Sequence, residues 1–308
     1  MQQEPIERGA PEHAALRTLH SPEFIAAWRA LVQRVFGLRE EDGCLRVRSL
    51  TGGTTLSYLP LLNYTDLGID EAQQLARRCG TRPYLVRALD WQTAAAPGDA
   101  VTMRLVLAGH DRDSLWMHAL GGKCRNQVRK AQRSQLVVRS GATPDLVDDF
   151  HALLARTLHR HGAPLLPRAL LQQLACDFTC RFHVAYRAGV PVAAIVAIDD
   201  HDLVWVPWAA ADPAAFASCP NHIVYWTAIE EAHAAGKTLF DFGRSPYGGS
   251  THRFKQQWGA VDVRIALLSP RAAGLYDKYA TAQRLWRRLP AAVVDRVGPW
   301  LCAYLPDY

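Results

Sequence analysis

Several signatures of common protein classes are missing from this sequence. It has no uninterrupted apolar run of about 18 residues or more, so we predict no transmembrane helix. Residues 1–7 lack a basic stretch followed by an apolar one, so we predict no signal peptide and a cytoplasmic location. The Gly-x-Ser-x-Gly elbow that serves covalent acyl-enzymes is missing. So is the Gly-x-Gly-x-x-Gly fingerprint of dinucleotide-binding folds, and we therefore expect neither class.

Cysteine and metal-binding patterns are equally sparse. The seven cysteines are odd in number and scattered through 308 residues, so we predict reduced thiols and no disulfide framework. His159 and His161 lie two positions apart, a spacing that does not bring both rings to one face of a helix. No acidic partner completes a site there. We predict neither a metal nor a cofactor.

The residues that are present describe a globular chain of moderate positive charge. Hydrophobic residues make up 49% of it and charged residues 21%, which is an ordinary globular composition. Its length suffices for one large domain or two modest ones. The net charge of +6 suits an anionic partner such as RNA or a nucleotide, without choosing among them.

The predicted elements follow a regular order from residue 136 onward, β-α-α-β-β-β-α-β-α-β. The expected strands are 136–139, 182–187, 192–199, 203–208, 238–242 and 261–268, and the expected helices are 144–161, 167–176, 221–235 and a short one from about residue 250. This order is the layout of the GNAT acyltransferase fold, a mixed α/β sheet with helices on both faces. The first 110 residues or so could be a degenerate copy of the same unit.

We divide the chain into four parts on this basis. Residues 1–20 form a loose segment, 21–115 a degenerate GNAT-like half, 116–269 a GNAT-like acyltransferase domain and 270–308 a pair of basic amphipathic helices split by Pro290. Such a helix pair could contact a membrane surface or an acidic partner. Packing onto the body of the protein is the commoner arrangement.

A glycine-rich stretch at residues 240–260 is the first candidate site. Gly243, Gly248 and Gly249 allow positive φ angles or a close approach of the backbone to a ligand. Ser250 and Thr251 are good N-cap residues for the helix that follows, and a helix N-terminus can receive an anion. The stretch therefore predicts a corner that binds an acyl donor or a phosphate.

Charged side chains strengthen this interpretation. Cations near a helix start oppose the helix dipole, so Arg253 and Lys255 suggest an acidic ligand. Arg244 and Arg253 could clamp phosphates, although Arg244 could equally pair with Asp241. His252 is the histidine that we expect to serve as a proton relay.

A basic helix is the second candidate site. Residues 104–139 contain eight Lys or Arg against two Asp, and 8 − 2 = +6 equals the net charge of the whole chain. Arg125, Arg129 and Arg133 recur every four residues and share one helical face, with Lys123 just before them. This face is either simply solvated or contacts phosphates. The second interpretation gains weight if the helix lies beside residues 240–260.

Both stretches resemble one known family. The run Lys123-x-Arg125-Asn126-x-x-Arg129-Lys130-Ala131 resembles the basic helix of FemAB/FemX-type aminoacyl transferases of the GNAT superfamily. Asp241-Phe242-Gly243-Arg244-Ser245 followed by Arg253-Phe254-Lys255-x-x-Trp258-Gly259 is similar to a second motif of that family. The resemblance is closest to FemAB-like proteins associated with exosortase/PEP-CTERM loci, and it covers residues 115–305.

The resemblance implies two GNAT-like halves and a transferase that moves an amino acid from aminoacyl-tRNA to an amine of a cell-wall precursor. In that family a Phe-Lys pair lies at the reaction centre, with the lysine steadying charge on the reacting carbonyl. The matching residues are Phe254 and Lys255, and Trp258 follows as a substrate-binding candidate. The tRNA-binding coiled-coil insertion of some members is absent from this sequence.

A conventional site for coenzyme A is not expected. Ordinary GNAT enzymes place an Arg/Gln-x-x-Gly-x-Gly/Ala loop after the fourth strand, and residues 208–221 contain no glycine. We therefore predict an acyl or aminoacyl transferase that forms an amide on a small-molecule or glycan-precursor amine, with aminoacyl-tRNA as donor. The alternatives are an acyl-CoA-dependent N-acyltransferase for an envelope or polysaccharide precursor, and a non-catalytic module that binds RNA or a membrane-associated complex.

Overall fold

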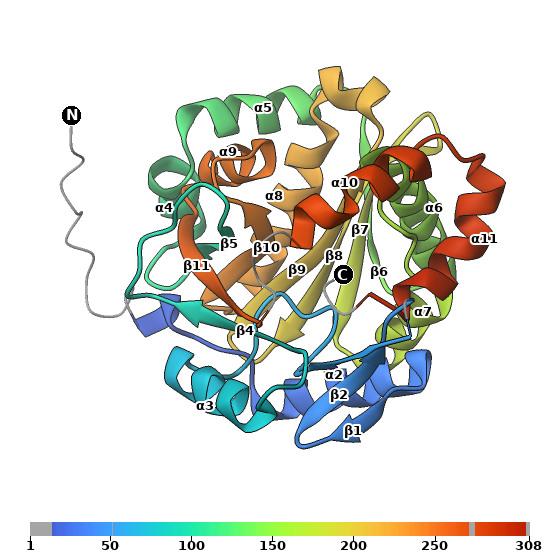
Figure 1. The fold of residues 1–308 in the computed structure, drawn as a ribbon. Coiled ribbons are helices and arrows are strands. Elements are labelled where there is room, and N and C mark those ends of the chain that lie inside the picture. The colour runs from blue at the N-terminus through green and yellow to red at the C-terminus, as the bar shows by residue number, and fades with distance from the viewer. Residues whose placement is uncertain (1–13, 51, 271–274, 306–308) are drawn as a thin grey trace.

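The strands of the chain form one mixed sheet. A computed structural model describes residues 14–50, 52–270 and 275–305 (Figure 1). The strands are β1 Arg39–Glu41, β2 Cys44–Arg48, β3 Thr54–Ser57, β4 Tyr84–Asp90, β5 Ala100–Val106, β6 Val137–Gly141, β7 Cys180–Arg187, β8 Val190–Asp200, β9 Leu203–Ala211, β10 Leu239–Pro246 and β11 Val261–Leu268. Their order in the sheet is β1-β2-β3-β4-β11-β5-β10-β9-β8-β7-β6. The last strand along the chain, β11, therefore lies in the middle of the sheet.

Helices cover both faces of this sheet (Figure 1). They are α2 Pro22–Phe36, α3 Ile69–Cys79, α4 Arg112–Ser114, α5 Gly122–Gln132, α6 Pro144–His161, α7 Arg168–Asp177, α8 Pro220–Ala234, α9 Ser250–Gln256, α10 Leu275–Trp286 and α11 Ala291–Cys302. A π-helical turn, Leu115–Ala119, links α4 to α5, and a 3-10 turn, Pro213–Ser218, precedes α8. Local signals set several of these bounds; Ser21 caps α2 by accepting from the Phe24 amide, and Gly37 ends it with φ 62°.

The core has two layers, one on each face of the sheet. The residues of β8 point alternately into one layer and the other. Ala194, Val196 and Ile198 pack with α2, α6 and α7. The residues between, among them Ile195, pack with α5 and α8. A sheet covered on both faces needs apolar residues at every position of its central strands, which explains the continuous apolar run in β8.

Most predicted elements of the mixed α/β fold are present, with two differences that matter for the site. The strand expected at 238–242 continues to Pro246, because a bulge at Gly243 carries the pairing past the glycine. The N-cap of α9 is Gly249 and not Ser250 or Thr251, and no side chain caps this helix.

The two C-terminal helices pack partly onto the body. Trp286 donates through Nε1 to the Ala163 carbonyl at 3.1 Å. Gly298 of α11 lies against Leu165, where an added Cβ would come within 2.6 Å of the Leu165 nitrogen. Among the described residues, no helix combines the length and apolar character needed to cross a membrane.

Candidate active site

The candidate site is organised around a bulge in β10. This strand pairs in parallel with β9 at Leu239–Asp241 and antiparallel with β5, where the register shifts between Asp241 and Arg244. Gly243 occupies the bulge with φ 74°, and a Cβ there would lie 2.3 Å from the Val206 carbonyl oxygen. Only glycine fits this position, and the bulge turns the carbonyls of Gly243 and Arg244 away from the regular ladder.

A buried carboxylate holds the bulge in shape. The Asp241 side chain is fully buried. It accepts hydrogen bonds from Tyr64 Oη at 2.8 Å, Thr102 Oγ1 at 2.5 Å and the Gly243 amide at 2.7 Å. Arg104, also fully buried, donates from Nε at 3.0 Å. Since a buried charge is tolerated when it is paired and hydrogen-bonded, this network fixes one backbone geometry at Gly243.

Lys255 places its ammonium against the same bulge. It lies on α9, and its side chain is buried, with 6% exposure. Nζ donates to the Gly243 carbonyl at 2.8 Å and to the Arg244 carbonyl at 3.0 Å. Burial lowers the pKa of Lys255 to about 7, while the Asp241 carboxylate opposes that shift. Near neutral pH this lysine can therefore exist in either protonation state, a property typical of functional lysines.

His252 and Arg253 contribute to the loop around Gly248. His252 is buried and accepts at Nδ1 from the Gly248 amide at 3.3 Å, and its Nε2 lies 3.9 Å from Asp262 Oδ1. Arg253 donates from Nη1 to the Gly248 carbonyl at 2.5 Å. Ser250 is exposed beside them. The side chains of His252 and Arg253 thus fold back onto the glycine loop.

An aromatic cluster surrounds Phe254, the residue before Lys255. Phe254 is half-buried and Trp258 has no exposed surface. The Trp258 ring lies 6.2 Å from Phe254 and 6.1 Å from Tyr225 between ring centroids. We expected Trp258 to bind substrate. Because other side chains enclose it, Trp258 would act on a ligand by positioning the Phe254 ring.

His222 is a candidate that the sequence reasoning missed. It lies in the first turn of α8, with its ring 5.1 Å from Phe254 and 5.8 Å from Trp258. Neither ring nitrogen has a hydrogen-bond partner among the described residues, and both are shielded from solvent. Burial, with a smaller contribution from the charge of Lys123, lowers the pKa of His222 to about 4. A neutral imidazole with two unused nitrogens beside Phe254 is a ready partner for a polar ligand. The only sequence signal was its position two residues after Pro220.

The basic helix and the glycine-rich stretch are neighbours. The Gly121 amide, at the start of α5, donates to the Gln257 carbonyl at the end of α9 at 3.0 Å. Lys123 is exposed and close enough to His222 to influence its pKa. The basic helix therefore lies beside residues 240–260, which is the arrangement that favours a contact with phosphates. Figure 1 shows α5 and α9 together at one end of the molecule.

The arginine stripe, however, has more than one role. Arg125 donates from Nη1 to the carbonyls of Met117 at 2.8 Å and Leu120 at 2.5 Å, and so closes the π-helical turn. The Arg129 guanidinium lies over the Trp116 ring at 5.4 Å. Lys123, Arg129 and Arg133 are exposed, whereas Arg125 is half-buried and donates to backbone carbonyls.

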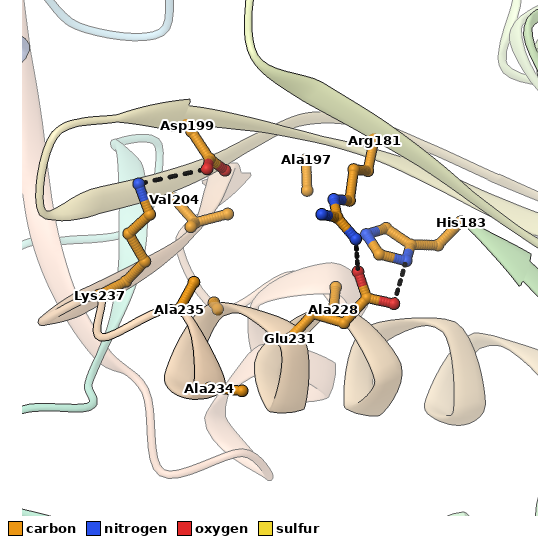
Figure 2. A pocket seen from close by; sticks show the side chains of 11 residues that line it. Arg181, His183, Ala197, Asp199, Val204, Ala228, Glu231, Ala234, Ala235 and Lys237 are labelled. Carbon is orange, nitrogen blue, oxygen red and sulfur yellow. Dashed lines mark hydrogen bonds and ion pairs between the residues drawn. The ribbon is translucent and has the colours of Figure 1, made fainter. Parts of the chain in front are cut away.

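A pocket lies near the C-terminal end of α8, away from His222, and is shown in Figure 2. It has a volume of about 370 Å³ and contains two ion pairs, Arg181–Glu231 at 3.0 Å and Lys237–Asp199 at 3.2 Å. The charges of these pairs neutralise one another, and His183 lies 3.9 Å from the same Glu231. Among the described residues, no cluster of three or more His, Cys, Asp or Glu could hold a metal.

Comparisons with known proteins agree with the fold. Residues 122–256 match the model of the acetyltransferase (GNAT) domain family. The fold is a GNAT-like mixed α/β fold, and across 92% of this chain and 100% of the other it is similar to the crystal structure of FemX, with a TM-score of 0.57 and 11% identity.

A second similar structure is the C-terminal domain of a putative lysylphosphatidylglycerol synthetase from Agrobacterium fabrum. The TM-score is 0.52 and the identity 12%, over 83% of this chain and 95% of that one. A search of curated proteins found no match. The chain therefore has a FemX-like tandem GNAT architecture, at an identity that shows the fold alone.

Proposed function

We propose that this protein transfers an aminoacyl group from aminoacyl-tRNA to an amine acceptor and forms an amide. The observation that carries the proposal is the buried Lys255 ammonium, held against the Gly243 and Arg244 carbonyls beside Phe254. A fixed donor in a water-poor site stabilises the oxyanion of an acyl transfer far better than water does. We also propose that the protein is related to the exosortase-associated FemAB-like proteins that its motifs resemble.

The reaction balances without a metal or a covalent intermediate. The acceptor nitrogen attacks the ester carbonyl, the new C–N bond forms, and the C–O bond to the ribose of the tRNA breaks. Lys255, in its protonated form, donates to the carbonyl oxygen as negative charge develops on it. The proton released by the amine ends on the ribose hydroxyl, with His252 as the proposed relay.

The donor preference is supported by the segment before α8. Ordinary GNAT enzymes have a glycine-rich loop before this helix. Here residues 213–218 form a 3-10 turn, and Cys219 at φ 56° is the N-cap of α8, without a side-chain hydrogen bond. A glycine-rich cradle for the pyrophosphate of coenzyme A would need backbone amides free to approach it. Lys123 and Arg129 of α5 supply exposed cations for the phosphates of a tRNA end instead.

The donor is tested with the purified protein and two radiolabelled pools. One pool is bulk tRNA charged with labelled amino acids, and the other is labelled acetyl-CoA and palmitoyl-CoA; amine-bearing nucleotide sugars serve as acceptors. We expect amide product from the first pool alone, and its loss after RNase treatment of the charged tRNA. Product from the CoA pool would favour the acyl-CoA alternative. Consumption of neither donor, together with tRNA binding that depends on Lys123 and Arg129, would favour the non-catalytic module.

A further inference from the structure

A pocket rich in arginine lies far from the candidate site. It has a volume of about 310 Å³ and lies between the end of α2, the β1–β2 hairpin and the end of α11. Arg39, Arg46 and Arg48 line it, together with Phe36 and Tyr304, and no acidic residue is among its lining. In Figure 1 the hairpin lies at the opposite end of the molecule from α5 and α9.

The strand register concentrates these arginines on one face. Arg39 lies directly opposite Arg46 in the β1–β2 pair, and Arg48 follows Arg46 by two residues on the same side. Like charges directly opposite each other destabilise a sheet. Within the described parts of the chain, neither Arg39 nor Arg48 forms an ion pair. Arg46 lies 3.8 Å from Glu41, which already binds Arg82 at 3.0 Å. An external anion would relieve this repulsion.

An exposed apolar face of α11 adjoins the pocket. Trp300 is 55% exposed and Val293 is 42% exposed, and their seven-residue spacing puts them on one side of the helix. The Trp300 ring lies 4.8 Å from the Tyr304 ring, between centroids, and Tyr304 lines the pocket. The opposite face of α11 is buried, with Val294 and Cys302 in the body. The apolar side chains therefore point outward, next to the arginines.

The charge of the neighbouring helices has the same sign. Within residues 281–305 the exposed charged residues are Arg284, Arg287, Arg288 and Arg296 against Asp295 alone. Basic residues with exposed aromatic and aliphatic side chains on a helix face are the combination that binds an anionic membrane surface. Tryptophan in particular favours the level of the lipid headgroups.

We infer that α11 and the arginine pocket form a docking surface for an anionic phospholipid bilayer. Trp300 and Val293 enter the boundary between headgroups and acyl chains, and the phosphate of one lipid headgroup occupies the pocket between Arg39, Arg46 and Arg48. Since the hairpin lies at the opposite end of the molecule from α5 and α9, a protein docked through the arginine pocket keeps its candidate active site away from the bilayer.

The test is co-sedimentation of the full chain with vesicles of phosphatidylcholine, alone or mixed with phosphatidylglycerol. We expect binding to the mixed vesicles that weakens as salt increases, and little binding to the neutral ones. The triple variant Arg39→Gln, Arg46→Gln, Arg48→Gln should lower the partition coefficient about a hundredfold, since each basic residue near an anionic surface contributes roughly fivefold.

A matched control removes the same charge elsewhere. The variant Arg112→Gln, Arg181→Gln, Lys237→Gln alters three ion-paired cations around the C-terminal end of α8, and it should bind vesicles nearly as wild type does. Trp300→Ser, at an exposed position, should weaken binding without changing the melting temperature.

Three results would overturn the inference. The first is equal binding of the wild type to neutral and anionic vesicles, and the second is equal loss of binding in the two triple variants. The third concerns a free anion: inorganic phosphate that raises the melting temperature in an Arg39-dependent manner, while no vesicle binds, would assign the pocket to a soluble phosphate and not to a bilayer. Circular dichroism of each variant checks that the fold is retained.

Discussion

Replacing Lys255 by methionine removes the ammonium and keeps most of the aliphatic side chain. In the wild type, Nζ donates to the Gly243 and Arg244 carbonyls from a position with 6% exposure. Methionine fills similar space but leaves these two carbonyls without their donor. If Lys255 stabilises the oxyanion, the turnover number should fall about 10²–10³-fold, as it does when one preorganised donor is lost.

The expected change in stability can be worked out from the pKa. Burial lowers the pKa of Lys255 from 10.5 to about 7, so keeping this side chain buried at pH 7 costs about 5 kcal/mol relative to an unperturbed lysine. Methionine removes that cost. The two carbonyls left unsatisfied cost about 1–3 kcal/mol each. The two effects nearly cancel, so the variant should be about as stable as the wild type at pH 7.

The lowered pKa also determines how the free energy of unfolding changes with pH. Between pH 7 and 10.5 the unfolded chain holds a proton on Lys255 that the folded chain has lost. The free energy of unfolding of the wild type therefore rises with pH across that window, through this residue, and that rise is absent in Lys255→Met. Near pH 10 the variant should be the less stable of the two by a few kcal/mol.

Two measurements decide the matter, namely transfer of a radiolabelled amino acid and denaturant unfolding at pH 7 and 10. Lys237→Met is the control, because Lys237 bonds to the His201 carbonyl and Asp199 in the distant pocket and should not affect turnover. A Lys255→Met enzyme that turns over within about threefold of wild type would refute a role in the reaction. A variant that loses activity only because it unfolds at pH 7 would refute the energetic reasoning.

Three further predictions follow from the same site. Turnover should decline above about pH 7 as Lys255 loses its proton, and a flat profile between pH 6 and 9 would contradict a protonated lysine in the rate-limiting step. Asp241→Asn leaves the buried Arg104 without its counter-charge and should lower the free energy of unfolding by about 3–5 kcal/mol in urea titrations; a loss below about 1 kcal/mol would mean that the pair is not needed. Arg125→Gln should destabilise by about 1–3 kcal/mol with unchanged tRNA affinity, whereas Arg129→Gln should weaken tRNA binding with little effect on melting.

Elements with clear local signals were predictable from the sequence. Pro144 at the first position and Gly162 just past the end bound α6 at the expected residues. Strand β11 likewise has the predicted bounds, Val261–Leu268. Such elements are specified by nearby residues, and the order of elements after residue 136 was enough to identify the GNAT-like fold class.

The site could be predicted only in part, because its decisive contacts are distant in sequence. Gly243 suggested the end of a strand, but pairing with β5 continues past it once Asp241 accepts the Gly243 amide. The sequence did not indicate that Arg125 donates to carbonyls of the preceding turn, because that turn is defined only in the folded chain. His222 had no motif around it, and its significance comes from Phe254 and Trp258, more than thirty positions away.

The position of β11 between β4 and β5 has a consequence for how the chain assembles. Val261–Leu268 pairs with Tyr84–Asp90 on one side and Ala100–Val106 on the other, so these two strands do not pair with each other. While the ribosome is still translating residues before 261, two neighbouring apolar strands have a gap between them that only a late segment can fill. Loop closure over such a long separation is slow. The unpaired edges would expose the nascent chain to misassembly and to chaperones until synthesis has passed Leu268.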